Sequence, residues 1–142
     1  MLNIHPIMQF LATLLALYVF TLGLARFRFL HLKQKTAFKW TRHVTLGTIA
    51  LLVWLFGLFA GLGMVYFYWH KFLLTGLHGK IGLIMLSFIL FGLISGHYMN
   101  RVKKKRTWLP LLHGLGNLTT LILALIQVTG GVMVYNSYVL GN

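Results

Sequence analysis

Four long stretches of the chain are almost wholly apolar, and the polar positions gather between them. These stretches cover residues 5–27, 43–68, 77–99 and 109–136. A helix needs about 20 mostly apolar residues to cross a bilayer, so each stretch is long enough. None alternates apolar and polar positions as a strand of a membrane barrel would. With short connections between the stretches, the pattern predicts an all-α protein, a four-helix transmembrane up-down bundle that forms a single membrane domain over residues 1–142.

The composition excludes most soluble functions. Hydrophobic residues make up 58% of the chain and charged residues only 9%, whereas a soluble domain carries about 25% charged residues of both signs. There are 13 Lys and Arg, no Asp or Glu, and no Cys. Carboxylate acid–base pairs, triads that contain Asp, carboxylate metal sites and disulfide scaffolds are therefore excluded. His, Lys, Arg and Tyr remain as the side chains for chemistry.

The basic residues predict how the bundle is oriented. Eleven of the 13 lie in or beside the connections after the first and third stretches, which an up-down bundle places on one side. The positive-inside rule puts that side in the cytoplasm and both termini outside. We expect an integral protein of a bacterial inner membrane. Basic clusters also occur in nucleic-acid-binding proteins, but orientation explains these ones and we expect no nucleic-acid partner.

The seven histidines carry the candidate chemistry, and four of them follow a regular pattern. His5, His43, His78 and His113 each stand at the start of one apolar stretch. Because successive helices are antiparallel, His5 and His78 share the outer level, and His43 and His113 share the inner level. Alternate helices of a four-helix bundle face each other across its diagonals, so each pair can bind both axial positions of a haem iron. A single His at a helix edge is more often an interfacial hydrogen-bonding group, but the pairing by level favours two b-type haems.

Glycines lie at the same two levels on the helices that carry no ligand there. They are Gly57, Gly61, Gly63, Gly130 and Gly131 at the outer level and Gly23, Gly92 and Gly96 at the inner level. We expect them to leave room for a porphyrin. The alternative is that the two Gly-x-x-x-Gly motifs serve helix packing alone.

Three basic residues lie close to the proposed ligands. We expect Lys39 and Arg42 at the inner level, and Lys80 at the outer level, to neutralise haem propionates; the alternative is that they serve orientation only. His31 is interpreted as solvated. His70 and His97 are candidates to replace a proposed ligand or to line a substrate site, and the sequence leaves their roles open.

The residues around the four histidines resemble motifs of the cytochrome b561 family, transmembrane cytochromes with two haems in a four-helix core. The similar segments are Asn3-Ile4-His5-Pro6-Ile7-Met8, Lys39-x-x-x-His43, Leu77-His78 with Gly82, and Leu112-His113 with Gly116, Gln127 and Gly130. The resemblance implies that the first ligand pairs with the third and the second with the fourth. The family usually has six helices, so the chain is similar to a compact, prokaryotic form. Its uncovered faces are then expected to meet lipid, a second copy in a homodimer, or another subunit of a larger complex.

These observations predict transmembrane electron transfer through two bis-His haems. A quinone, a small reductant or another cytochrome is the expected redox partner, and whether the protein is itself an oxidoreductase stays open. One alternative is a haem-bearing anchor subunit of a quinone-linked oxidoreductase. Another is an assembly subunit without haem.

Overall fold

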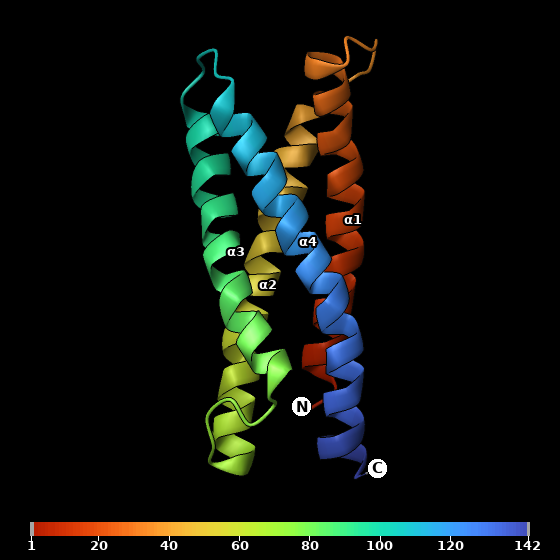
Figure 1. The fold of residues 1–142 in the computed structure, drawn as a ribbon, viewed down its shortest axis with the longest axis vertical. Coiled ribbons are helices and arrows are strands. Elements are labelled where there is room, and N and C mark those ends of the chain that lie inside the picture. The colour runs from red at the N-terminus through yellow and green to blue at the C-terminus, as the bar shows by residue number, and fades with distance from the viewer. Residues whose placement is uncertain (1, 142) are drawn as a thin grey trace.

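The computed structural model describes residues 2–141, and these residues form four long helices joined by short loops (Figure 1). The helices are α1 (Ile4–His31), α2 (Trp40–Trp69), α3 (Leu77–Arg101) and α4 (Trp108–Tyr135). A short π-helix, η1 (Asn136–Leu140), continues α4. No strand occurs among the described residues, so the all-α prediction is confirmed.

The helices extend beyond the apolar stretches that predict them, chiefly at one end of the bundle. The first helix continues from the predicted end at residue 27 to His31, and the second begins at Trp40 rather than residue 43. These added turns contain basic residues, which lower the hydropathy without opposing helix formation. Arg28 and His31 in the last turn of α1 also interact favourably with the negative end of the helix dipole.

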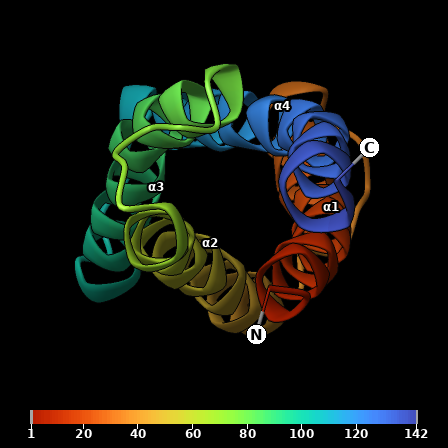
Figure 2. The ribbon, with the colours of Figure 1, turned by 90° about the horizontal axis from the view of Figure 1, so that it is seen from below.

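Neighbouring helices are antiparallel and stand at the corners of a square (Figure 2). Helix α1 contacts α2 and α4, and α3 contacts α2 and α4, most closely within the hairpins α1–α2 and α3–α4. Within the described part of the chain, the backbones of the diagonal pairs α1–α3 and α2–α4 do not approach each other closely. The up-down bundle is therefore confirmed, together with the diagonal placement on which the pairing of histidines depends.

The two ends of the bundle differ in charge. The loops over residues 32–39 and 102–107, with the helix turns beside them, carry 11 of the 13 Lys and Arg residues at what we call the basic end. The start of α1, the end of η1 and the loop over residues 70–76 lie at the opposite end, which we call the terminal end (Figure 1). Lys103 Nζ lies 3.9 Å from the centroid of the Trp40 ring, so a cation–π contact joins the two loops of the basic end.

The outer surface of the bundle is suited to lipid. All four helices are long and apolar enough to cross a membrane, with mean hydropathies between 1.8 and 2.2. Large apolar side chains face outward along their length; Phe56 and Ile94, for example, are each 68% exposed. A soluble monomer rarely exposes apolar surface on this scale, so helix length and composition identify an integral membrane protein.

The bundle core is a cluster of apolar side chains at mid-height. It consists of Ala12, Leu51, Trp54, Met85, Ile89, Leu121 and Ala124. The indole of Trp54 is 5% exposed, and its Nε1–H donates a hydrogen bond to Thr13 Oγ1 at 3.4 Å. Along each helix, the core residues stand between the levels of the two candidate histidine pairs. This core therefore separates a site at the terminal end from a site at the basic end.

Candidate functional site

Burial divides the seven histidines into two groups. His5, His43, His78 and His113 are half-buried, whereas His31, His70 and His97 are exposed. The four half-buried residues are those at the start of the four apolar stretches. His70 is the C-cap residue of α2 and has a left-handed backbone conformation with φ 51°. It therefore has a structural role at the end of this helix.

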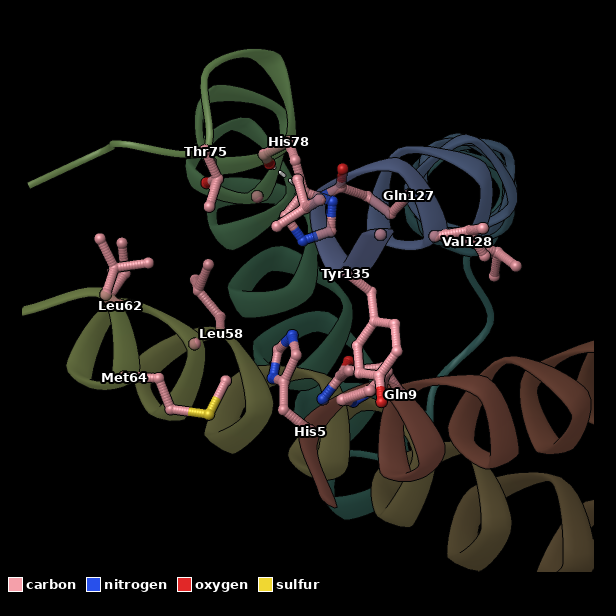
Figure 3. A pocket seen from close by; sticks show the side chains of 18 of the residues that line it. His5, Gln9, Leu58, Leu62, Met64, Thr75, His78, Gln127, Val128 and Tyr135 are labelled. Atoms are coloured by element: carbon pink, nitrogen blue, oxygen red, sulfur yellow. Dashed lines mark hydrogen bonds between the residues drawn. The ribbon is translucent and has the colours of Figure 1, made fainter. Parts of the chain in front are cut away.

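His5 and His78 point into one cavity at the terminal end, from helices at opposite corners of the bundle (Figure 3). The cavity has a volume of about 700 Å³. Sites for small molecules and cofactors have volumes of roughly 300–1,000 Å³, so this space is large enough for one. Its lining is mostly apolar, with a few polar groups, among them Gln9, Gln127 and Tyr135.

Each imidazole at the terminal end lies against a glycine of the antiparallel neighbour. A Cβ added at Gly61 of α2 would be 2.9 Å from His5 Cε1, a distance that real Cβ atoms essentially never show. A Cβ added at Gly131 of α4 would be 3.5 Å from His78 Cε1, which is an ordinary contact. A side chain at position 61 would therefore displace His5, whereas position 131 is less crowded.

The basic end repeats this arrangement with the roles of the helices exchanged. A Cβ added at Gly23 of α1 or at Gly96 of α3 would be 3.2 Å from Cε1 of His43 or His113, respectively. Most of the glycines predicted to leave room for a porphyrin therefore lie against imidazole rings, whereas Gly63 has nothing within 4 Å. Whether they also border a porphyrin remains a prediction.

Two amide side chains that the sequence analysis did not single out accompany the histidines. Gln9 follows His5 by one turn, occupies the space beside Gly57 and donates from Nε2 to the carbonyl of Val53 at 3.2 Å. Asn117 follows His113 by one turn, and its Oδ1 would be 2.7 Å from a Cβ at Gly92.

In both hairpins, then, a His-x-x-x-amide pair lies on a Gly-x-x-x-Gly motif of the neighbouring helix. The spacing of four residues, common to both motifs, is the signal that would have revealed these amides, because residues four apart share one helix face.

Both imidazoles at the basic end have a hydrogen-bonded Nδ1. His43 Nδ1 lies 3.3 Å from the carbonyl of Val19, and His113 Nδ1 lies 2.8 Å from Ser95 Oγ. The carbonyl of Val19 can only accept, so His43 carries its proton on Nδ1. Ser95 donates its hydroxyl proton to the carbonyl of Phe91 at 2.5 Å, so Ser95 Oγ accepts from Nδ1–H of His113. In both residues this assignment leaves Nε2 free to bind a metal.

Neither His43 nor His113 lines the large cavity or the shallow groove described below. The basic end therefore has two imidazoles oriented by hydrogen bonds, and neither of them borders the large cavity.

The terminal end contains buried polar atoms without partners. Among residues 2–141, Nδ1 of His5, Nδ1 of His78 and Oε1 of Gln127 are buried and make no hydrogen bond. Gln127 Nε2 does donate to the carbonyl of His78 at 2.9 Å, which holds its Oε1 beside the cavity. A buried polar group without a partner costs about 1–3 kcal/mol. The terminal end is therefore the less fully hydrogen-bonded of the two histidine levels, because Nδ1 of His43 and of His113 is hydrogen-bonded at the basic end.

The arrangement suits a cofactor that supplies most of its own metal ligands. Nowhere in the described part of the chain do three or more His residues come together as a metal-binding group. A structural zinc site needs four protein ligands, whereas a porphyrin iron needs only the two axial ones. Two imidazoles facing each other across a cavity therefore fit a haem better than a bare metal ion.

The three basic residues predicted near the propionates are all exposed. Lys39 is the N-cap residue of α2, and Arg42 lines a shallow groove with Tyr18, Thr41, Thr45 and Leu46. Lys80 is not among the residues that line the large cavity. The structure thus places His5 and His78 on one cavity that Lys80 does not line, and the role of the three basic residues at the propionates stays a prediction.

No protein-family model matches the chain, and no curated protein or solved structure is similar to it.

Proposed function

We propose that this protein is a transmembrane electron-transfer cytochrome with two bis-His b-type haems, a compact relative of the cytochrome b561 family. His5 and His78 hold the haem at the terminal end, and His43 and His113 hold the haem at the basic end. One observation carries the proposal: the four half-buried histidines stand in two diagonal pairs, one near each end, and each ring lies against a glycine.

The side chains around the rings have distinct tasks in this proposal. The hydrogen bonds of His43 to Val19 and of His113 to Ser95 hold Nδ1–H and direct Nε2 toward a metal. Two imidazoles per iron leave no open coordination position, which favours electron transfer over oxygen chemistry. Haem supplies the redox chemistry when it is bound. The core around Trp54 places apolar side chains between the two sites.

The orientation and partners follow from charge and surface. The positive-inside rule places the basic end in the cytoplasm and the termini outside, as in a bacterial inner membrane. A quinone, a small reductant or another cytochrome is the redox partner. The exposed apolar faces of the four helices would meet lipid, a second copy of the chain, or another subunit of a larger oxidoreductase.

Haem content of the purified protein tests the proposal. We expect a red preparation with two haems per chain by pyridine haemochrome. His5→Ala and His78→Ala should each remove one haem, the same one, and His43→Ala and His113→Ala should each remove the other. The exposed His70 and His97 provide matched controls, because alanine at either position should leave both haems.

Other outcomes select the alternatives. A colourless protein that still folds would leave an assembly subunit without haem. Haem-loaded protein that is stable only with a co-purified redox enzyme would indicate an anchor subunit. Loss of haem on changing His70 or His97 would show that the ligand assignment is wrong.

A further inference from the structure

Arg106, in the loop between α3 and α4, has a guanidinium group that is only partly satisfied. Its Nη1 donates to the carbonyl of Val102 at 2.9 Å, and its Cζ lies 4.7 Å from the centroid of the Tyr98 ring. The other two nitrogens, Nε and Nη2, are buried and have no hydrogen-bond partner within residues 2–141. A guanidinium stays charged at any physiological pH, so these two N–H groups need an acceptor.

The chain has no acidic side chain that could supply one. Its sequence contains no Asp or Glu, and three lysines, Lys103, Lys104 and Lys105, directly precede Arg106. A buried charge is costly unless it is paired, and here every neighbouring formal charge is positive. The counter-charge for Arg106 must therefore come from another molecule, and that molecule must be an anion.

We propose that Nε–H and Nη2–H of Arg106 bind the phosphate of an anionic phospholipid headgroup. These two nitrogens lie on the same edge of the guanidinium plane, and this edge forms two parallel hydrogen bonds to phosphate. The contacts of Nη1 with Val102 and of the planar group with Tyr98 hold that edge in place. The proposal concerns the basic end of the bundle and is independent of haem.

The surroundings of Arg106 favour a lipid over a soluble anion. The loop connects two helices that are long and apolar enough to cross a membrane, and Trp108, 76% exposed, begins the second of them. Trp residues favour the headgroup level of a bilayer. Below Arg106, Tyr98, Ile94 and Phe91 lie on one face of α3 and are exposed. An acyl chain can lie along this face while the phosphate contacts the guanidinium.

Retention of defined lipids by the full-length protein tests the site. The protein is purified in a neutral detergent, mixed with phosphatidylglycerol or phosphatidylcholine, and examined by native mass spectrometry. We expect wild type to retain phosphatidylglycerol preferentially and Arg106→Gln to bind it about tenfold more weakly, the loss of a charge-assisted pair of hydrogen bonds. Arg101→Gln and Lys105→Gln remove the same charge from exposed neighbouring positions and should bind it as wild type does.

A second variant and a competing anion keep the test decisive if Arg106→Gln folds poorly. Arg106→Lys keeps the charge but cannot form two parallel hydrogen bonds to one phosphate. It should therefore also lose the preference for phosphatidylglycerol. Inorganic phosphate alone should neither displace the lipid nor protect the protein against heat. The proposal is overturned if phosphate protects as well as the lipid does, or if both Arg106 variants retain the lipid. It is also overturned if they lose haem rather than lipid, because the guanidinium would then serve a cofactor carboxylate.

Discussion

Ser95 Oγ lies 2.8 Å from Nδ1 of His113, and this contact determines which imidazole nitrogen is free. The serine hydroxyl proton is directed to the carbonyl of Phe91, so Oγ accepts from Nδ1–H. The amide nitrogen of Asn117 is also near Nδ1, at 3.4 Å, but an amide N–H would favour an unprotonated Nδ1. The shorter contact with Ser95 therefore determines the tautomer of His113, and Nε2 stays available as a ligand.

Ser95→Ala should weaken haem binding at the basic end. Without the serine oxygen, the Asn117 amide becomes the nearest partner of Nδ1 and favours the tautomer with its proton on Nε2. We expect a loss of about 10- to 100-fold in haem affinity, typical of removing a partner of a metal-bound histidine. Titration of the apoprotein with haem measures this, and redox titration reports any change in midpoint potential. Thr120→Val, which removes a buried hydroxyl bonded only to Gly116, is the control; equal affinity in both variants would contradict the assigned role.

Alanine at Gly61 and at Gly63 should have opposite effects. A Cβ at Gly63 has nothing within 4 Å, so Gly63→Ala should raise the free energy of unfolding by about 0.5–1 kcal/mol through helix propensity. A Cβ at Gly61 would be 2.9 Å from His5 Cε1, so Gly61→Ala should displace the ring and remove the haem of the terminal end alone. Haem per chain and thermal unfolding in detergent are measured for both. Retention of two haems in Gly61→Ala would show that His5 does not need this space.

Trp54 should be among the most important side chains for stability. It is 5% exposed in the core between the two sites. Trp54→Ala should lower the free energy of unfolding by about 3–5 kcal/mol, the range for truncating a buried aromatic residue. Phe56→Ala removes an outward-facing ring two residues away and should lower the free energy of unfolding far less. Reversible unfolding in mixed micelles provides the measurement, and similar losses in the two variants would argue against this core.

Gln127 should matter for the loaded protein more than for the empty one. Its Nε2 donates to the carbonyl of His78, but its Oε1 is buried without a partner. Gln127→Met removes one hydrogen bond and one unsatisfied atom at similar volume, so the two effects on the cofactor-free protein should cancel to within about 1 kcal/mol. Binding of haem at the terminal end should weaken, because His78 loses a contact that holds its turn. If the variant loses the same stability with and without haem, Gln127 supports the fold and has no role in haem binding.

The apolar stretches and basic connections were sufficient to predict the four helices, their up-down order and the levels of the four histidines. These properties depend on local hydropathy and on distance along the chain, which a linear pattern records directly. The expected pairing of His5 with His78, and of His43 with His113, rests on level and diagonal alone and stays a prediction.

The contacts between helices could not be read in this way, because they depend on how each helix is rotated about its axis. Lys80 shares the level of His78, but two residues along a helix are about 200° apart, so Lys80 faces away from the cavity. Two antiparallel helices must meet at a particular rotation and register for the imidazoles to contact Gly61 and Gly96. The same holds for the contact between the Ser95 hydroxyl and His113. A repeating apolar pattern leaves that rotation almost undetermined in a helix surrounded by lipid on one side and apolar neighbours on the other. Packing of small residues against large ones selects it.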